Sequence, residues 1–188
     1  MNRKELMKRE FAKTLLRLSL EKPLEGITVS ELAKECGVSR GTFYNHFFDI
    51  YDLINWIFEM EVSGPLQRYI ETHDKSWSGI TQQCLEKMYQ RKTFYCQAVH
   101  FAGQNSLQGY MRKRNLDCWR KLIEGYMGTE KTFDPDLLDL YERFTADAVA
   151  NMVIDWALSG MKTPPERMAQ MDCVVTRGIY GLIDAANE

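Results

Sequence analysis

The stretch TVSELAKECGVSRGTFYNHF, residues 28–47, decides the fold. Thr28 is a good helix N-cap, and Glu31 three residues later completes the T-x-x-E capping box, in which each residue satisfies a free backbone N–H. Apolar side chains then recur at i, i+3, i+4 and i+7, at Val29, Leu32, Ala33 and Cys36. This pattern predicts an amphipathic helix that starts just after residue 28.

A second, shorter helix is predicted after a glycine turn. Gly37 ends the first helix, because the residue past a helix end often needs the left-handed conformation that glycine adopts cheaply. Ser39 caps the next helix, in which Phe43 and Phe47 share the inner face. The two helices together predict a helix-turn-helix. Its outer face carries polar and basic residues that fit a DNA groove: Arg40, Gly41, Thr42, Tyr44, Asn45 and His46.

Several of these side chains match the chemistry of DNA. Arg40 can bind guanine O6 and N7 together, Asn45 can bind adenine N6 and N7, and the Thr42 methyl can contact a thymine methyl. Tyr44 and His46 are expected to reach phosphates, which position the protein without specifying sequence. Each residue taken alone is equally well explained as an ordinary polar side chain on a surface helix. Their combination on a capped helix-turn-helix favours DNA binding.

The charge distribution agrees with this interpretation. The 188-residue chain has a net charge of −2, which by itself indicates no nucleic-acid partner. Residues 1–47, however, carry nine Lys and Arg against six Asp and Glu, whereas the remainder carries fifteen against twenty. The basic end is therefore the end with the motif, as attraction to phosphate requires.

Other functional classes have little support in the sequence. The charged N-terminus is followed by no long apolar run, so we expect neither a secretory signal nor a membrane span. We therefore expect a cytoplasmic protein. Five scattered cysteines without metal-ligand spacing favour reduced thiols, with no metal and no cofactor. The chain has no nucleophile-elbow, phosphate-loop or zinc-protease motif, and its three histidines are dispersed. We expect no catalytic residues and no enzyme.

Helical signals continue along the whole chain, and no stretch alternates long enough for a convincing strand. Apolar periodicity and Gly or Pro punctuation predict a helix over 3–21, a fourth helix from residue 50 to about 61, and further helices at 66–73, 77–90, 92–103, 106–127, 134–160 and 164–187. The predicted fold class is all-α. A three-helix DNA-binding head, residues 1–62, is joined by the fourth helix to a C-terminal body for effector binding and dimerisation, residues 63–188. Gly64-Pro65 and the polar run 72–79 are the candidate boundaries between them.

The body contains the material for an apolar pocket and for a dimer interface. The candidate pocket residues are aromatic, sulfur-containing or polar: Met88, Cys96, His100, Phe101, Tyr110, Trp119, Tyr126, Met152 and Trp156. The alternative for all of them is plain core, and for His100 a hydrogen-bonded core histidine. The last two helices are apolar over more surface than one neighbour can cover, which predicts symmetric pairing, with a monomeric body as the alternative. The expected interface residues are Tyr141, Phe144, Ala148, Met152, Val175, Gly178, Ile179 and Leu182.

Residues 3–62 resemble the N-terminal domain of the TetR family of bacterial transcription regulators. The shared motif is T-x-x-x-[IL]-A-x-x-[AC]-G-V-S-x-G-T-[FL]-Y-x-[HY]-F, matched here at Thr28, Leu32, Ala33, Cys36, Gly37, Val38, Ser39, Gly41, Thr42, Phe43, Tyr44, His46 and Phe47. The resemblance implies that the DNA contacts come from Thr28, Ser39, Arg40, Gly41, Thr42, Tyr44, Asn45 and His46. It also implies a homodimer formed through the last two helices. Many relatives carry phosphate-gripping lysines just after the motif, where this chain has Phe48 and Ile50.

The resemblance implies a repressor that binds a near-palindromic operator in double-stranded DNA and is released by a small apolar or aromatic effector. A second interpretation comes from residues 48–62 and 92–111, which look like a DhaS-like subgroup of the family. That subgroup implies an activator whose body binds a co-activator protein. An enclosed pocket in the body would favour the first function, and a large exposed apolar patch away from the dimer interface the second.

Overall fold

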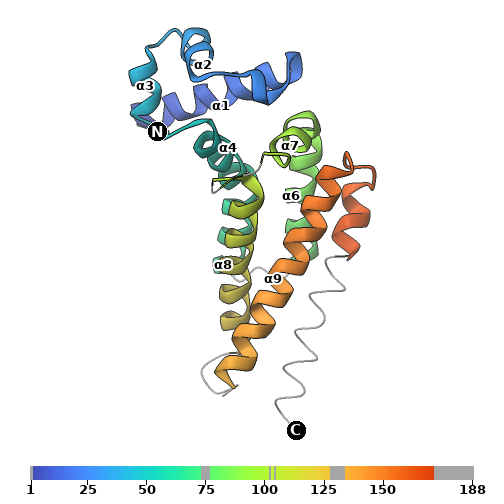
Figure 1. Cartoon of the computed structure of the whole chain (residues 1–188). Coiled ribbons are helices and arrows are strands. Elements are labelled where there is room, and N and C mark those ends of the chain that lie inside the picture. The colour runs from blue at the N-terminus through green and yellow to red at the C-terminus, as the bar shows by residue number, and fades with distance from the viewer. Residues whose placement is uncertain (1, 73–76, 102, 104, 128–133, 172–188) are drawn as a thin grey trace.

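The computed structural model describes residues 2–72, 77–101, 103, 105–127 and 134–171. All regular elements in these residues are helical, which confirms the predicted all-α class. The N-terminal helices lie together at one end of the molecule, and the two longest helices run through the rest (Figure 1).

The N-terminal group forms the head. It consists of α1 (Arg3–Glu21), a 3₁₀ turn η1 (Leu24–Gly26), α2 (Val29–Glu35) and α3 (Arg40–Tyr44). The Asn2 side chain caps α1 by accepting a hydrogen bond from the Glu5 N–H. Lys22 follows α1 in extended conformation, and Pro23 cannot continue the helix.

One helical run leads from the head into the body. It comprises α4 (Ile50–Phe58), a π-helical turn η2 (Glu59–Ser63) and α5 (Gly64–Thr72). The Gly64 N–H donates to the Glu59 carbonyl, and a Cβ at position 64 would lie only 2.6 Å from that oxygen. Pro65 brings no N–H to the helical ladder. The Gly-Pro pair therefore marks a wide turn within a helix, and the break expected there is absent.

Four further helices build the body: α6 (Trp77–Gln90), α7 (Lys92–Ala98), α8 (Leu107–Met127) and α9 (Pro135–Leu158). Residues 165–171 are also helical at the end of the described chain. The bounds predicted for helices 3–21 and 77–90 agree with α1 and α6. The helix predicted at 92–103 was too long, because α7 ends at Ala98 and the Gln108 side chain takes the Val99 carbonyl at 2.8 Å.

The apolar core is continuous from head to body. Phe11 and Leu15 of α1 pack with Phe43 of α3, and the same cluster extends through α4 to α6, α7 and α9. A smaller second cluster joins Trp119, Leu122 and Ile123 of α8 to Ala146 of α9. A shared core means that displacement of body helices can be transmitted to the head.

Candidate DNA-binding surface and effector cavity

The first motif helix is capped as its sequence predicts. The Thr28 Oγ1 accepts the Glu31 N–H at 3.2 Å. The Lys22 Nζ donates hydrogen bonds to both carboxylate oxygens of Glu31, at 2.6 Å to Oε1 and 2.5 Å to Oε2. The hydrogen bond from the Lys22 side chain, and to a lesser extent that from the Thr28 backbone, lowers the pKa of Glu31. The start of α2 is thus tied to the segment that follows α1.

The turn between the motif helices depends on one glycine. Gly37 has φ of +67°, in the left-handed region that an L side chain adopts only with strain. The Val38 N–H returns to the Ala33 carbonyl at 2.9 Å and closes the helix end. Ser39 then caps α3 by accepting the Thr42 N–H at 3.1 Å. This confirms the local geometry predicted for the motif.

The inner face of α3 is held by aromatic packing. Phe43 is fully buried and meets the Phe11 ring edge-on, with ring centroids 5.2 Å apart. Phe47 is 2% exposed and packs on both rings. Because α3 is anchored on this side, its opposite side faces outward.

Six of the eight residues expected to contact DNA are exposed to solvent. The side chains or backbone of Thr28, Ser39, Arg40, Gly41, Tyr44 and Asn45 are exposed, and those of Thr42 and His46 are half-buried. Thr42 Oγ1 lies 3.0 Å from Ser39 Oγ. The helical part of the set is short, because α3 ends at Tyr44 and Asn45 is its C-cap.

His46 lies in a basic corner of this surface. Burial lowers the pKa of the His46 imidazole, and the nearby Lys4 and Lys8 lower it further, which favours the neutral ring. Its Nδ1 is buried and has no hydrogen-bond partner among the described residues. Lys8 lies over the rings of Phe47 and Trp56, with its Nζ 5.0 and 5.7 Å from their centroids. Two α1 lysines thus supply positive charge beside the end of the motif.

The positions that hold lysines in many relatives differ in character here. Phe48 is 79% exposed, and its backbone N–H is held by the Asp52 carboxylate at 3.0 Å. Ile50 is half-buried at the start of α4 and packs against the core. Tyr44 and Tyr51 also expose large parts of their rings. An exposed apolar side chain, Phe48, therefore stands where many relatives carry a phosphate-binding lysine.

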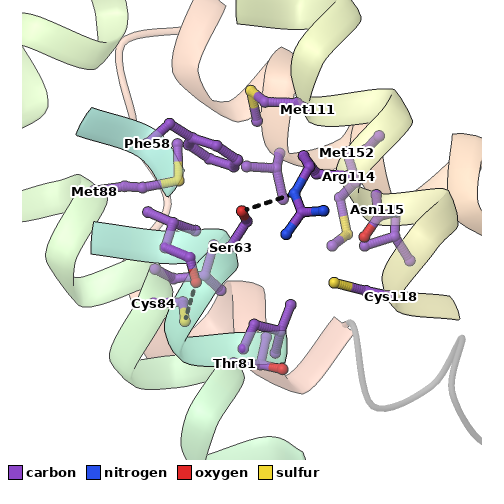
Figure 2. A pocket seen from close by; sticks show the side chains of 16 residues that line it. Phe58, Ser63, Thr81, Cys84, Met88, Met111, Arg114, Asn115, Cys118 and Met152 are labelled. Carbon is purple, nitrogen blue, oxygen red and sulfur yellow. Dashed lines mark hydrogen bonds between the residues drawn. The ribbon is translucent and has the colours of Figure 1, made fainter. Parts of the chain in front are cut away.

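The body contains a partly open cavity of about 80 Å³ lined by residues of α4, η2, α5, α6, α8 and α9. Figure 2 shows how its walls meet. Its lining is mostly apolar, with a few polar groups: Phe58, Val62, Ser63, Leu66, Thr81, Cys84, Leu85, Met88, Met111, Arg114, Asn115, Cys118, Val149, Ala150, Met152 and Val153. A mostly apolar concavity with few polar groups is typical of small-molecule sites.

Two of the nine predicted pocket residues, Met88 and Met152, line this cavity. The others lie elsewhere. His100 follows the end of α7 and is exposed, and half-buried Phe101 packs edge-on against Tyr51. Half-buried Cys96 packs on the core. The side chain of Tyr126 lies outside the described residues.

The remaining predicted pocket residues have structural partners. Trp119 is buried in the second cluster. The Trp156 Nε1 donates to the Thr163 carbonyl at 2.8 Å. Tyr110 donates to Glu59 at 2.9 Å. Sequence periodicity identified apolar helix faces, but it does not tell which of them converge on a cavity.

A polar network at the π-turn was missed by the sequence reasoning. Arg114 donates from Nε and Nη2 to the two oxygens of Glu59, both at 2.9 Å. Glu59 also accepts from the Ser63 and Tyr110 hydroxyls. Burial raises the pKa of Glu59, but hydrogen bonds from Ser63 and Tyr110 and the Arg114 charge outweigh it and leave the pKa below its ordinary 4.5. The only sequence signal is the Gly-Pro pair that forces the turn.

The Gln97 side chain of α7 forms hydrogen bonds with the head. Gln97 Nε2 donates to the Ser19 carbonyl at 3.1 Å, and its Oε1 accepts the Leu24 N–H at 2.7 Å. Asn55 of α4 also donates to the Asn105 carbonyl at 3.1 Å. The two Gln97 bonds hold the end of α1 and η1 against the body, and the Asn55 bond holds α4 against the segment that precedes α8.

The outer face of α9 presents apolar side chains to solvent. Leu137, Leu140 and Phe144 are 54%, 64% and 72% exposed and occur at helical spacing. Of the predicted interface residues, Phe144 and Ala148 lie on this exposed face, Tyr141 packs on the second cluster, and Met152 faces the cavity. Val175, Gly178, Ile179 and Leu182 lie outside the described residues.

Two remaining observations concern metals and membranes. Cys36, Cys84, Cys96 and Cys118 are free thiols, whereas Cys173 lies outside the described residues. Within the described part of the chain, no group of His, Cys, Asp and Glu is placed to hold a metal ion. No described helix is both long and apolar enough to cross a bilayer.

Two family models match the chain. Residues 13–55 match the tetR family of bacterial regulatory proteins, and residues 75–178 match a transcriptional regulator C-terminal region. The second match alone covers more than half of the chain.

Curated relatives and a solved structure agree with these matches. The HTH-type transcriptional regulator SAR2658 of Staphylococcus aureus strain MRSA252 is 26% identical over 147 residues, covering 73% of this chain and 75% of that protein. SAB2452 of the bovine strain RF122 / ET3-1 is 25% identical over 131 residues, covering 68% of this chain and 66% of its own length. The structure of the dihydroxyacetone kinase operon activator DhaS superposes with a TM-score of 0.66 at 18% identity, covering 95% of this chain and 96% of that one. This last likeness is one of fold.

Proposed function

Since the chain belongs to the TetR family of helix-turn-helix transcriptional regulators, we propose that it is a homodimeric repressor released from its operator by a small effector. In this proposal residues 1–62 bind DNA, and residues 63–188 bind the effector and form the dimer. The two-fold axis of the dimer would place two recognition helices about one DNA turn apart on a near-palindromic site.

One observation carries the regulatory part of the proposal. A single helical run, residues 50–72, starts directly after the recognition motif and supplies Phe58, Val62, Ser63 and Leu66 to the cavity wall. A ligand that shifts this wall would therefore shift the helix that follows α3. Such a ligand releases DNA only to the extent that it binds the two body conformations with different affinity.

On the DNA side, the exposed set around α3 supports assigned roles. Arg40, Gly41 and Asn45 would lie nearest the base edges. Thr28, Ser39, Thr42, Tyr44 and His46 would contact the backbone, which the basic corner of Lys4 and Lys8 favours electrostatically. The exposed apolar face of α9 supports dimer formation.

Activation together with a co-activator protein is the second candidate, favoured by the fold shared with the activator DhaS. The cavity favours the effector-released repressor. The exposed apolar side chains of α9 belong to the face expected to dimerise, so they offer no separate co-activator surface.

Selection of bound fragments from random DNA, using the full-length protein, tests the function directly. We expect an inverted repeat with two equivalent half-sites. Transcription in vitro from a promoter that contains the recovered site then separates the candidates: repression by the protein alone supports the first, and stimulation supports the second. Recovery of no preferred sequence would contradict the operator.

A further inference from the structure

We infer that the cavity selects a neutral, ring-sized apolar molecule with one hydrogen-bonding group, and rejects a carboxylate of the same shape. The inference rests on the proposed function, because it names the effector class of the same cavity. Three features carry it: the charge at the wall, one buried hydroxyl without a partner, and a lining rich in sulfur.

The charge at the wall disfavours an anion. Arg114 carries the one charged group among the described lining residues, and its side chain is only 19% exposed. Glu59 occupies its Nε and Nη2, Gln67 takes Nη2 at 2.5 Å, and Asp117 takes Nη1 at 3.3 Å. The guanidinium is therefore already paired with carboxylates and has no open donor pair for an anion. An anionic ligand would have to displace Glu59 or enter the cavity without a counter-ion.

One threonine of the wall carries a buried hydroxyl that lacks a hydrogen-bond partner in the described part of the chain and that a ligand could draw toward the cavity by rotation of the side chain. Thr81 Oγ1 is buried and has no hydrogen-bond partner among the described residues. Thr81 lies on α6 with Cys84, Leu85 and Met88 at i+3, i+4 and i+7, and all four line the cavity. A buried hydroxyl without a partner is destabilising, so a ligand that hydrogen-bonds to it gains affinity.

The rest of the lining is soft and adaptable. Five sulfur side chains line the cavity, those of Cys84, Cys118, Met88, Met111 and Met152 (Figure 2). Burial raises the pKa of Cys84 to about 12 and that of Cys118 to about 11, so both thiols are uncharged at neutral pH. Sulfur packs favourably on aromatic rings, and methionine rotates easily.

The size of the cavity limits the ligand. A cavity of about 150 Å³ accepts benzene. The present volume of about 80 Å³ is smaller, so one small ring fits only if the methionines rearrange to widen the cavity. Larger fused-ring compounds would need displacement of helices.

The test compares three probes of one shape: toluene, benzyl alcohol and benzoate. Binding to the full-length protein is measured by titration calorimetry. Benzyl alcohol is expected to bind most tightly. The dissociation constant of benzoate should be at least about tenfold higher, because its charge loses water in a partly buried site without gaining a partner. Equal affinity for benzoate and benzyl alcohol, or binding of none of the three, would overturn the inference.

Two variants assign the selectivity to residues. Thr81→Val should lower the affinity for benzyl alcohol about fivefold, because one hydrogen bond is lost, and should leave the affinity for toluene unchanged. Thr93→Val, at an exposed position of α7, is the matched control. Glu59→Gln frees the Arg114 charge and should raise benzoate affinity. Asp117→Asn is the second variant should Glu59→Gln fail to fold, and unchanged benzoate affinity in the folded variant would refute the charge argument.

Operator binding in the same samples separates this inference from the proposed function. Probes that bind selectively without releasing DNA uphold the ligand class and contradict the effector role. Release of DNA by benzoate as readily as by benzyl alcohol upholds the effector role and contradicts the ligand class.

Discussion

The Arg114 guanidinium grips both oxygens of the Glu59 carboxylate at 2.9 Å, which ties α8 to the π-turn between α4 and α5. Ser63, which lines the cavity, hydrogen-bonds to the same carboxylate. The pair therefore lies where the helix that follows the helix-turn-helix motif meets the cavity of the body. A ligand that disturbs this turn would act directly on α4.

Replacing Arg114 by methionine is expected to lower the free energy of unfolding by about 2 kcal/mol, since it leaves the Glu59 charge unpaired at a largely buried site. We reduce the figure typical of fully buried pairs because the Glu59 side chain is 29% exposed. Urea denaturation measures the change. Arg112→Met, which removes only a surface bond to Asn151, is the control and should cost less than about 0.5 kcal/mol.

The same pair predicts a pH dependence. Because the folded-state pKa of Glu59 is below its ordinary 4.5, its stabilisation is complete above pH 4.5 and is lost as the pH falls through the folded-state value. Arg114→Met removes one of the groups that lower this pKa. Its unfolding free energy should therefore fall less than that of the wild type on acidification, and a parallel fall in both proteins would contradict the assignment.

Gln97→Met is expected to loosen the head on the body. The substitution keeps the side-chain size but leaves the Ser19 carbonyl and the Leu24 N–H without their partner, at a cost of about 1 to 3 kcal/mol. Operator release should then require more effector, because the body is coupled less tightly to the head. Gln108→Met removes a bond within the body alone and serves as the comparison. Equal effects on release in the two variants would remove the special role of Gln97.

The head could be predicted from the sequence almost residue by residue, because its determinants are local. Caps at Thr28 and Ser39, the left-handed turn at Gly37 and the inner face at Phe43 all depend on neighbours within a few positions. The position and lining of the cavity depend on which helix faces converge once the helices have packed together. Periodicity identified the apolar faces that include Met88 and Met152, whereas it could not show that Arg114 and Glu59 would meet across 55 positions.

Arg40→Ala is expected to cost about 1 to 3 kcal/mol of binding free energy at one base pair per half-site. The substituted protein should then tolerate every base at that position, as measured with a set of single-base operator variants. Lys34→Ala, at an exposed position of α2, is the control. A loss that is uniform across all operator variants would show that Arg40 contacts only phosphate.

Phe48→Lys is expected to strengthen operator binding and to make it more sensitive to salt. Phe48 is 79% exposed beside the recognition motif, so a lysine there can reach the DNA backbone without disturbing the core. Each added phosphate contact steepens the slope of log K against log salt by about 0.9, or about 1.8 for a dimer. Titrations at several salt concentrations measure the slope. An unchanged slope would place Phe48 away from the DNA.

Phe144→Asp is expected to abolish the dimer and with it tight operator binding. The ring is 72% exposed on the face of α9 that also presents Leu137 and Leu140, so the substitution leaves the core of one chain intact. In a two-fold interface it places two carboxylates in an apolar contact, where each is strongly disfavoured. Sedimentation equilibrium should show a folded monomer that retains its helical circular dichroism.

Lys113→Gln, at an exposed position of α8, is the control and should leave the dimer intact. Loss of one recognition head from the complex removes half of the base contacts, so operator affinity should fall by orders of magnitude while weak binding to a single half-site persists. A Phe144→Asp protein that sediments as a dimer would place the interface on another face of the body. A monomer that still binds the full operator tightly would instead show that the two half-sites are read independently.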